Sequence, residues 1–252
     1  MSAKIVKQPP PVADPTIDEV LDEFLEEQRR RLAPRTFRNY EDVVHLLRDC
    51  LNGYGYQWLS KKEAALFDRH YNAEGDAHRD FCQLFGPEKI LGELDHFLGT
   101  FMIRKVGAGE DFLRAAGTAV GKLAEWLMAN DHVAEDRGRE VAEDVAATAR
   151  ELPRAARAAR LLDDATSQLR IDPDSLADDD YHDFDHYTIA KIGSESVWLS
   201  VWDPGKGEST VGPIPAPAAA TKLLREGWDV SCALARVRGT WRMIDVANVY
   251  PL

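Results

Sequence analysis

The chain has 252 residues, of which 44% are hydrophobic, and a formal net charge of −12. This length suits one large or two modest globular domains, and we expect two. An acidic chain is repelled at long range from nucleic acid and anionic membranes, so any phosphate binding must come from a local basic patch. The polar start and the lack of a long apolar run predict a cytoplasmic protein that does not enter a membrane.

The N-terminal part of the chain has the pattern of paired amphipathic helices. The capping-box pattern Thr16-x-x-Glu19 predicts a helix start, and apolar residues follow at helical spacing up to Leu32. Pro34 ends this pattern, and a second helix is expected to begin nearby and to end before Gly53. We expect the two helices to form an antiparallel hairpin.

Further helices are predicted on both sides of Asn130. Ser60-x-x-Glu63 is a second capping box and predicts a short helix. Helical apolar spacing then runs from Pro87 to a glycine-containing break at 106–109, and again from about 110 to 128. Beyond Asn130 the sequence has many Ala, Arg and Glu residues, which indicates exposed helices interrupted at Pro153.

From Phe184 onward the sequence has the alternation of β-strands. Five strand-like segments are separated by turn signals, with a short helix between the third and the fourth. This order is typical of an OB-like small barrel, and an SH3-like barrel also accommodates it. The predicted fold class is α+β, with a helical domain at 15–133, an acidic helical connector at 134–183 and a small β-barrel domain at 184–252.

The motifs of the first 133 residues resemble those of a known family. A helix ending at a basic turn precedes Thr36-x-x-x-Tyr40, and a later helix ends in Trp126-Leu127. This pattern resembles the SAM-like core-binding domain of tyrosine recombinases and phage integrases, with 53–87 as an insertion. The resemblance implies a helical bundle that holds one side of duplex DNA. It places these residues near the phosphates: Arg30, Arg31, Arg35, Thr36 and Arg38.

The catalytic residues of that family are not found in the sequence. Recombinases carry an Arg, an H-x-x-R motif and a tyrosine nucleophile in a separate catalytic domain. Here the H-x-x-R motif, His45 to Arg48, falls within the second predicted helix, where it is most simply a pair at the edge of solvent. The sequence also lacks a Gly-rich phosphate loop, a nucleophile elbow and an H-E-x-x-H motif. We therefore expect a protein that is not an enzyme and that uses no cofactor.

The segment Arg29 to Tyr40, with five arginines in twelve residues, is the best candidate for a phosphate-binding surface. Arginine forks suit phosphate, and free N–H groups at a helix start also favour an anion. The alternative is that the arginines complement the helix dipole and pair with Glu26 and Glu27.

A second basic row is predicted on the helix that ends near Met128. Arg114, Thr118 and Lys122 lie four residues apart on the face opposite the apolar one, as suits a helix facing a DNA groove. Asp111 and Glu125 dilute this charge. The sequence therefore favours a solvated helix face over DNA binding here.

The predicted barrel offers an aromatic surface. Its candidate residues for stacking single-stranded nucleic acid are Trp198, Trp202 and Trp241, with Arg236, Arg238 and Arg242. Stacking sites usually accompany a basic groove, but residues 184–252 have no net charge. The aromatic face is therefore better suited to contact a protein partner or another domain.

Two further sets of residues are candidates for metal binding or for disulfide bonds. The acidic segment from Asp178 to His186 contains His182 and His186, but we interpret it as a linker leading into a strand and predict no metal site. Cys50, Cys82 and Cys232 lie far apart, so we expect three reduced and buried thiols.

The sequence thus favours a non-catalytic DNA-binding protein related to recombinase core-binding domains. The alternative is an adaptor that uses the same folds to bind protein partners. The local arginines favour the first hypothesis, and the net charge favours the second.

Overall fold

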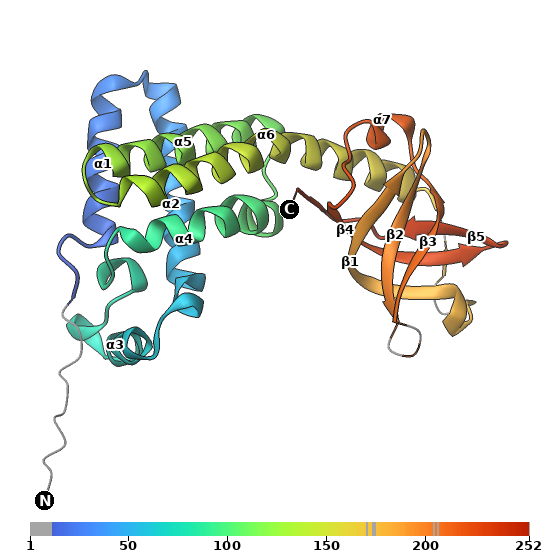
Figure 1. Ribbon diagram of the computed structural model, residues 1–252, viewed down its shortest axis with the longest axis horizontal. Helices are drawn as coiled ribbons and strands as arrows, with labels where there is room; N and C mark the ends of the chain where they lie inside the picture. The colour runs from blue at the N-terminus through green and yellow to red at the C-terminus, as the bar shows by residue number, and fades with distance from the viewer. Residues whose placement is uncertain (1–11, 170, 173–174, 204, 206, 252) are drawn as a thin grey trace, which may run out of the picture. The chain divides into compact units, whose positions relative to one another are not determined.

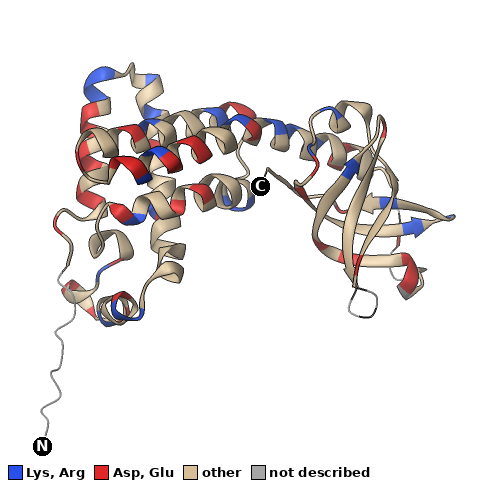
Figure 2. Cartoon of the chain, viewed as in Figure 1, with Lys and Arg blue, Asp and Glu red and all other residues tan. Residues whose placement is uncertain are grey.

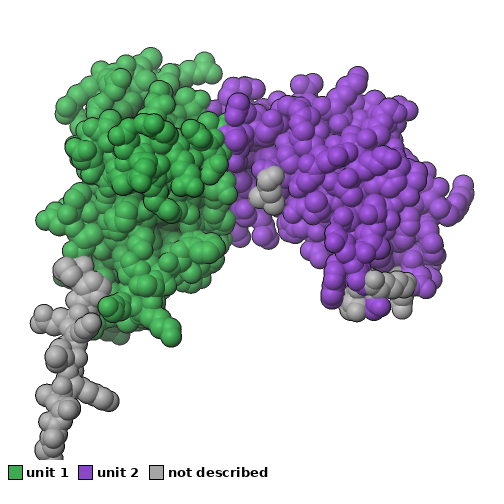
Figure 3. All heavy atoms as spheres, in the orientation of Figure 1, with its two compact units in different colours: residues 1–97, 115–146 green, residues 98–114, 147–252 purple. Residues whose placement is uncertain are grey.

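The computed structural model describes residues 12–169, 171–172, 175–203, 205 and 207–251. Helices precede a sheet along the chain (Figure 1). The chain divides into two compact units, residues 1–97 with 115–146 (unit 1) and residues 98–114 with 147–252 (unit 2; Figure 3). These units differ from the predicted domain ranges, because residues 98–114 of the predicted helical domain belong to unit 2 and the predicted connector is divided between the two units. None of the described helices combines the length and the apolar character that a membrane crossing requires.

Unit 1 begins with a helical hairpin. α1 (Ile17–Arg31) starts at the predicted capping box of Thr16 and Glu19. α2 (Pro34–Tyr54) follows and continues through Gly53, where its end was predicted. Gly53 is exposed, so it lowers helix propensity without removing a packing contact, and the helix tolerates it. The rings of Phe24 and Tyr40 stack with their centroids 6.2 Å apart, which joins the apolar faces of the two helices.

Arg48 joins α1 and α2 at the other end of the hairpin. Its side chain is 19% exposed, its Nε lies 3.1 Å from Asp18 Oδ1, and it also pairs with Asp22. The prediction that His45 and Arg48 form a solvent-edge pair was therefore wrong for Arg48. Antiparallel packing turns this side of α2 toward the start of α1, and the arginine holds the hairpin together.

The other helices of unit 1 pack onto this hairpin. α3 (Lys61–Tyr71) begins at the predicted Ser60 and Glu63 capping box. α5 (Glu110–Ala129), which belongs to both units, ends next to the predicted stop at Asn130. Its Trp126 packs edge-on against Phe24 and donates from Nε1 to Glu27 at 2.7 Å. The remaining helical segments that start before α5 are α4 (Glu88–His96), a π-helical stretch Phe97–Val106, and 3-10 turns Gly55–Trp58, Gly75–Ala77 and Phe81–Gln83.

The Glu63 carboxylate makes part of the stability of unit 1 sensitive to acid. Partial burial raises its pKa, but hydrogen bonds from Lys89 (Nζ to Oε1, 2.7 Å) and Ser60 outweigh burial and lower the pKa from 4.5 to about 2. A carboxyl group with a lowered folded-state pKa contributes stability above its ordinary pKa and loses that contribution as the pH falls through the folded-state value. The contribution of Glu63 therefore disappears between pH 4.5 and about 2.

We expect Glu63→Gln to reduce the pH dependence of the free energy of unfolding in this window, by at most about 3 kcal/mol. Urea unfolding of the full chain at a series of acidic pH values measures the effect. Glu74→Gln, which alters an exposed carboxylate of the same unit, is the matched control. Equal acid sensitivity of wild type and Glu63→Gln would contradict the assignment.

α6 (Glu135–Thr166) is one continuous helix, so the predicted interruption at Pro153 was wrong. Pro153 is buried, and its neighbours Leu152 and Ala155 are fully buried. Their packing offsets the backbone hydrogen bond that proline cannot donate. The last turns of α6 are also not an exposed connector, because Ala158 and Leu162 belong to the same apolar core as the strands of unit 2.

Unit 2 contains a six-stranded sheet in the order β3-β2-β1-β4-β5, with β6 paired to β4 and all pairs antiparallel. The predicted α+β class is confirmed, as is the order of three strands, a helix and further strands, but the predicted last strand is divided into β5 and β6. Alternation along β2 places Val197, Leu199 and Val201 in the core. The bounds are β1 (Tyr181–Ile192), β2 (Ser196–Asp203), β3 (Gly207–Pro215), α7 (Ala218–Thr221), β4 (Asp229–Val237), β5 (Thr240–Ile244) and β6 (Val249–Tyr250), after a 3-10 turn at Asp178–Asp180.

Candidate functional site

The basic turn between α1 and α2 carries the first predicted phosphate-binding residues (Figure 2). Arg30 pairs with Glu26 at 2.9 Å, and Arg31 pairs with Glu27 at 2.7 Å, each one turn apart on α1. This is the pairing that the alternative interpretation expects. Each of these guanidinium groups therefore already has a carboxylate partner, although exposed pairs of this kind contribute only about 0–1 kcal/mol.

Arg29, in the same turn, contacts α2. Its guanidinium lies 3.8 Å from Glu41 Oε1 and 5.1 Å from the centroid of the Phe37 ring. The arginine therefore covers the half-buried Phe37 and serves the hairpin itself.

The first turn of α2 differs from the last turn of α1, because its arginines form no salt bridge with a described residue. Arg35, Thr36 and Arg38 are exposed, and within the described part of the chain neither arginine has a salt bridge. The N-cap residue is Ala33, which has no side-chain oxygen, and the first turn contains no acidic residue. By contrast, α1 and α3 each satisfy their first N–H groups with a capping box. α2 therefore presents uncapped N–H groups and two guanidinium groups to an anion.

The cations predicted on α5 are neutralised locally. Lys122, in unit 1, pairs with Glu125 at 2.7 Å, and this hydrogen bond raises the pKa of its ammonium group. Arg114, in unit 2, pairs with Asp111 at 2.7 Å. Thr118 is exposed on the same helix. The arrangement is that of a solvated helix face, as the alternative interpretation expects.

The predicted aromatic residues of β2 differ in exposure. Trp202 is 71% exposed. Trp198 is half-buried: Lys191 Nζ lies 4.8 Å from its ring centroid, and a Cβ on Gly212 of β3 would lie only 2.5 Å from its Cδ1. Trp198 thus packs closely on the neighbouring strand, and Trp202 is left as the exposed tryptophan of β2.

Trp241 lies on β5 and packs against its own neighbours. Its ring stacks on His182 at 4.9 Å, and the guanidinium of Arg236 lies 5.5 Å from its centroid. Arg242 is half-buried, and Arg238 is exposed in the turn before β5. These contacts occupy Trp241, so it does not form a single stacking platform with the tryptophans of β2.

A groove of about 600 Å³ lies along β1 and β2. It exposes two aromatic rings, Phe184 at 51% and Trp202 at 71%. Its acidic lining residues are Asp183, Asp185 and Glu208, and none of its described lining residues is Lys or Arg. Because three carboxylates repel phosphate, the groove suits a cationic or uncharged partner better than nucleic acid.

The two histidines considered as metal ligands lie on β1. His182 stacks on Trp241, and the His186 ring lies 5.0 Å from that of Tyr250. Among the described residues, neither histidine joins a group of three metal-ligating side chains. The side chain of Asp178 lies outside the described residues.

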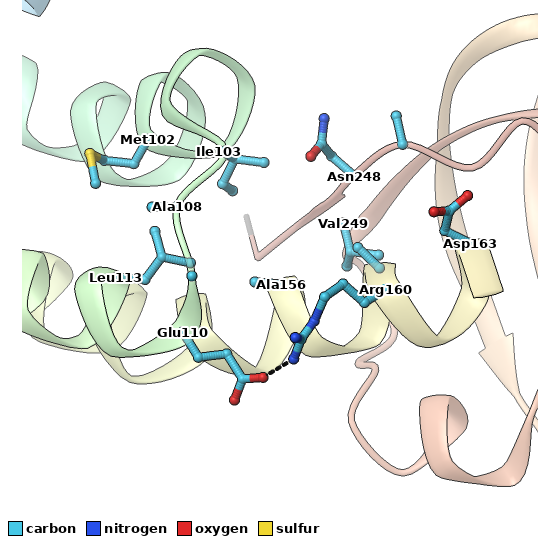
Figure 4. A pocket seen from close by; sticks show the side chains of 14 residues that line it. Met102, Ile103, Ala108, Glu110, Leu113, Ala156, Arg160, Asp163, Asn248 and Val249 are labelled. Atoms are coloured by element: carbon cyan, nitrogen blue, oxygen red, sulfur yellow. Dashed lines mark hydrogen bonds and ion pairs between the residues drawn. The ribbon is translucent and has the colours of Figure 1, made fainter.

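A second cavity in unit 2, of about 240 Å³, is lined partly by Met102, Leu113 and Val249. Arg160 is the only cation among its described lining residues, and its guanidinium pairs with Glu110 (Figure 4). The cavity therefore offers no free cation to an anionic ligand.

The comparisons with known proteins assign no family. No protein-family model, curated protein or solved structure matches the chain. Proposals about function therefore rest on the geometry of its own residues.

One cluster of thiol, carboxyl and imidazole side chains was not predicted from the sequence. The three cysteines are free and buried, as predicted, but Cys50 is grouped with Glu93 and His96 in unit 1. The available signal was Glu93-x-x-His96, a spacing that puts two ligands on one helix face. The third ligand comes from another helix, which spacing alone does not identify.

Proposed function

We propose that this chain is a non-catalytic DNA-binding protein that contacts the phosphate backbone through the first turn of α2. The observation that carries the proposal is the uncapped start of this helix beside two arginines, Arg35 and Arg38, that form no salt bridge with any residue that the structure describes. Helix N–H groups and guanidinium forks are the groups that bind phosphate in proteins. Because the chain has a net charge of −12, we expect this binding to be local and strongly dependent on salt.

The architecture supports a relation to recombinase core-binding domains in unit 1 and an OB-like barrel in unit 2. In unit 1, an antiparallel hairpin with a basic turn packs against α5, which carries Trp126 in its last turn, in the order that the resemblance implies. In unit 2, a long β1 pairs with both β2 and β4, and a helix separates β3 from β4. This order of elements is the one expected of an OB-like barrel, and it supports that proposal over the SH3-like alternative.

The test is binding of a duplex oligonucleotide by the full chain over a range of salt concentrations. We expect Arg35→Ala and Arg38→Ala each to weaken binding to all DNA sequences and to reduce the slope of log K against log[salt] by about one. Their stability should change by less than about 0.5 kcal/mol, because both side chains are exposed.

Arg30→Ala is the matched control, since its guanidinium already pairs with Glu26. We expect a smaller change in DNA affinity for this variant than for Arg35→Ala. If wild type shows no salt-dependent affinity for duplex DNA even at low ionic strength, the proposal fails.

A second candidate function is the binding of a protein partner, and the groove along β1 and β2 favours it. Exposed Phe184 and Trp202 provide aromatic contact area, and the carboxylates around them suit a basic segment of a partner. This function needs no phosphate contact. A chain without affinity for DNA would therefore leave it as the better hypothesis.

A further inference from the structure

The side chains of Cys50, Glu93 and His96 form a compact cluster inside unit 1. Cys50 comes from α2, and Glu93 and His96 come from α4. Cys50 Sγ lies 3.6 Å from Glu93 Oε1 and 3.8 Å from His96 Nδ1, and the imidazole and carboxylate form a short hydrogen bond. All three candidate ligand atoms lie within 4.8 Å of one another.

The position of Glu93 requires an explanation. The residue is 1% exposed, and its described polar contacts are the Cys50 thiol and the His96 ring, with no Lys or Arg. A buried carboxylate is costly unless a positive charge or a metal ion compensates it. The cluster therefore places a buried carboxyl group next to a thiol and an imidazole, and all three side-chain types are zinc ligands.

The geometry does not match a nucleophile-base relay. In such a relay the base uses one ring nitrogen to take a proton from the nucleophile and the other to contact its orienting carboxylate. Here the same atom, His96 Nδ1, faces both Cys50 and Glu93. Burial, followed by the Glu93 charge, also raises the pKa of the Cys50 thiol, which is opposite to nucleophile activation.

The sulfur, oxygen and nitrogen atoms of the three side chains face one another, which is the arrangement expected around a metal ion. Tetrahedral zinc has bonds of about 2.3 Å to sulfur and about 2.0–2.1 Å to nitrogen or oxygen, which places ligand atoms about 3.3–3.6 Å apart. The two separations from Cys50 Sγ, 3.6 and 3.8 Å, are close to these values. Only the hydrogen-bonded imidazole and carboxylate would have to separate to admit the ion.

We propose that Cys50, Glu93 and His96 form a zinc-binding site in unit 1. One thiolate, one carboxylate and one imidazole leave a fourth tetrahedral position for a solvent molecule. The His96 side chain is 31% exposed, which provides a route for the ion from solvent. The ring of Tyr54 packs edge-on against His96 at 5.2 Å and orients it. Binding would release the thiol proton to solvent and stabilise the folded unit, since the ligands come from two helices.

Cobalt(II) is the probe for the test, because its spectrum reports thiolate ligation and tetrahedral geometry. Purified full-length protein, stripped of metal by a chelator, is titrated with Co²⁺ and then with Zn²⁺. We expect a thiolate-to-cobalt charge-transfer band that saturates at one ion per chain, and its loss when zinc displaces cobalt. Zinc should also raise the melting temperature.

Three variants assign the ligands. Cys50→Ala should abolish the charge-transfer band, and His96→Gln and Glu93→Gln should each weaken binding by more than about tenfold. Cys232→Ala is the matched control, because Cys232 is an equally buried thiol that is grouped with no other ligand among the described residues. It should leave the titration unchanged.

The proposal is overturned if wild type gives no thiolate band, or if the band survives Cys50→Ala. Should Cys50→Ala or Glu93→Gln fail to fold, His96→Gln decides, because His96 is partly exposed and its replacement is tolerated more easily. A folded His96→Gln protein that binds cobalt as tightly as wild type also contradicts the site. In that case the cluster is a purely structural contact between α2 and α4.

Discussion

Replacement of Phe24 by alanine is expected to lower the free energy of unfolding of unit 1 by about 3–5 kcal/mol. Phe24 is fully buried. Its ring contacts those of Tyr40 on α2 and Trp126 on α5, at centroid distances of 6.2 and 5.5 Å. The substitution therefore removes apolar contact with two helices at once and leaves a cavity that rigid neighbours cannot fill.

Chemical denaturation, followed by far-ultraviolet circular dichroism and tryptophan fluorescence, measures this loss. His45→Ala, on the exposed face of α2, is the matched control and should change the free energy of unfolding by less than about 0.5 kcal/mol. If Phe24→Ala destabilises no more than this control, α1, α2 and α5 do not share the core described above.

Local signals predicted the helices of unit 1 well. Two capping boxes set the starts of α1 and α3, and Asn130 marks the end of α5. Such signals depend on residues close in sequence, which is why spacing reveals them. Contacts between helices were not predictable in this way. Arg48 was assigned to solvent because its partners, Asp18 and Asp22, lie about 30 residues away on α1.

The site residues that could be predicted are likewise those whose contacts are local in sequence. The pairing of Arg30 with Glu26 follows from helical spacing and was foreseen as the alternative to phosphate binding. Arg35 and Arg38 form no salt bridge with the described residues because no carboxylate of a neighbouring element lies close to them. The spacing of residues in the sequence does not reveal such a tertiary arrangement. The cluster of Cys50 with α4 residues depends likewise on how two helices pack.

The Ala-rich segment after Asn130 shows how composition can mislead. Small residues and alternating charges suggested an exposed connector. In the structure, however, Ala155, Ala158 and Ala159 face the strands of unit 2 and are buried. The alanine side chain is small, so a helix face made of alanines stabilises the core by letting the strands pack close to the helix. In a sequence, such a face is easily mistaken for a solvated one.

Replacement of Leu162 by alanine tests this assignment directly. Leu162 is 1% exposed and lies in the same apolar core as Trp228 and the inward residues of β2. We expect Leu162→Ala to lower the free energy of unfolding of unit 2 by about 2–5 kcal/mol, because a large aliphatic side chain leaves a packed core. The fluorescence of the buried Trp228 should report the earlier unfolding of this unit in denaturant.

Arg157→Ala changes a residue on the exposed side of the same helix and is the matched control. Comparison of the two variants shows whether α6 is part of the core of unit 2 or only a connector. If α6 is part of the core of unit 2, only Leu162→Ala should shift the denaturation midpoint, and the control should stay within about 0.5 kcal/mol of wild type. If the helix only links the two units, both variants should unfold at the wild-type denaturant concentration. The difference between the two variants is more informative than either value alone, because both remove side-chain contacts from the same helix and both gain the same helix propensity of alanine.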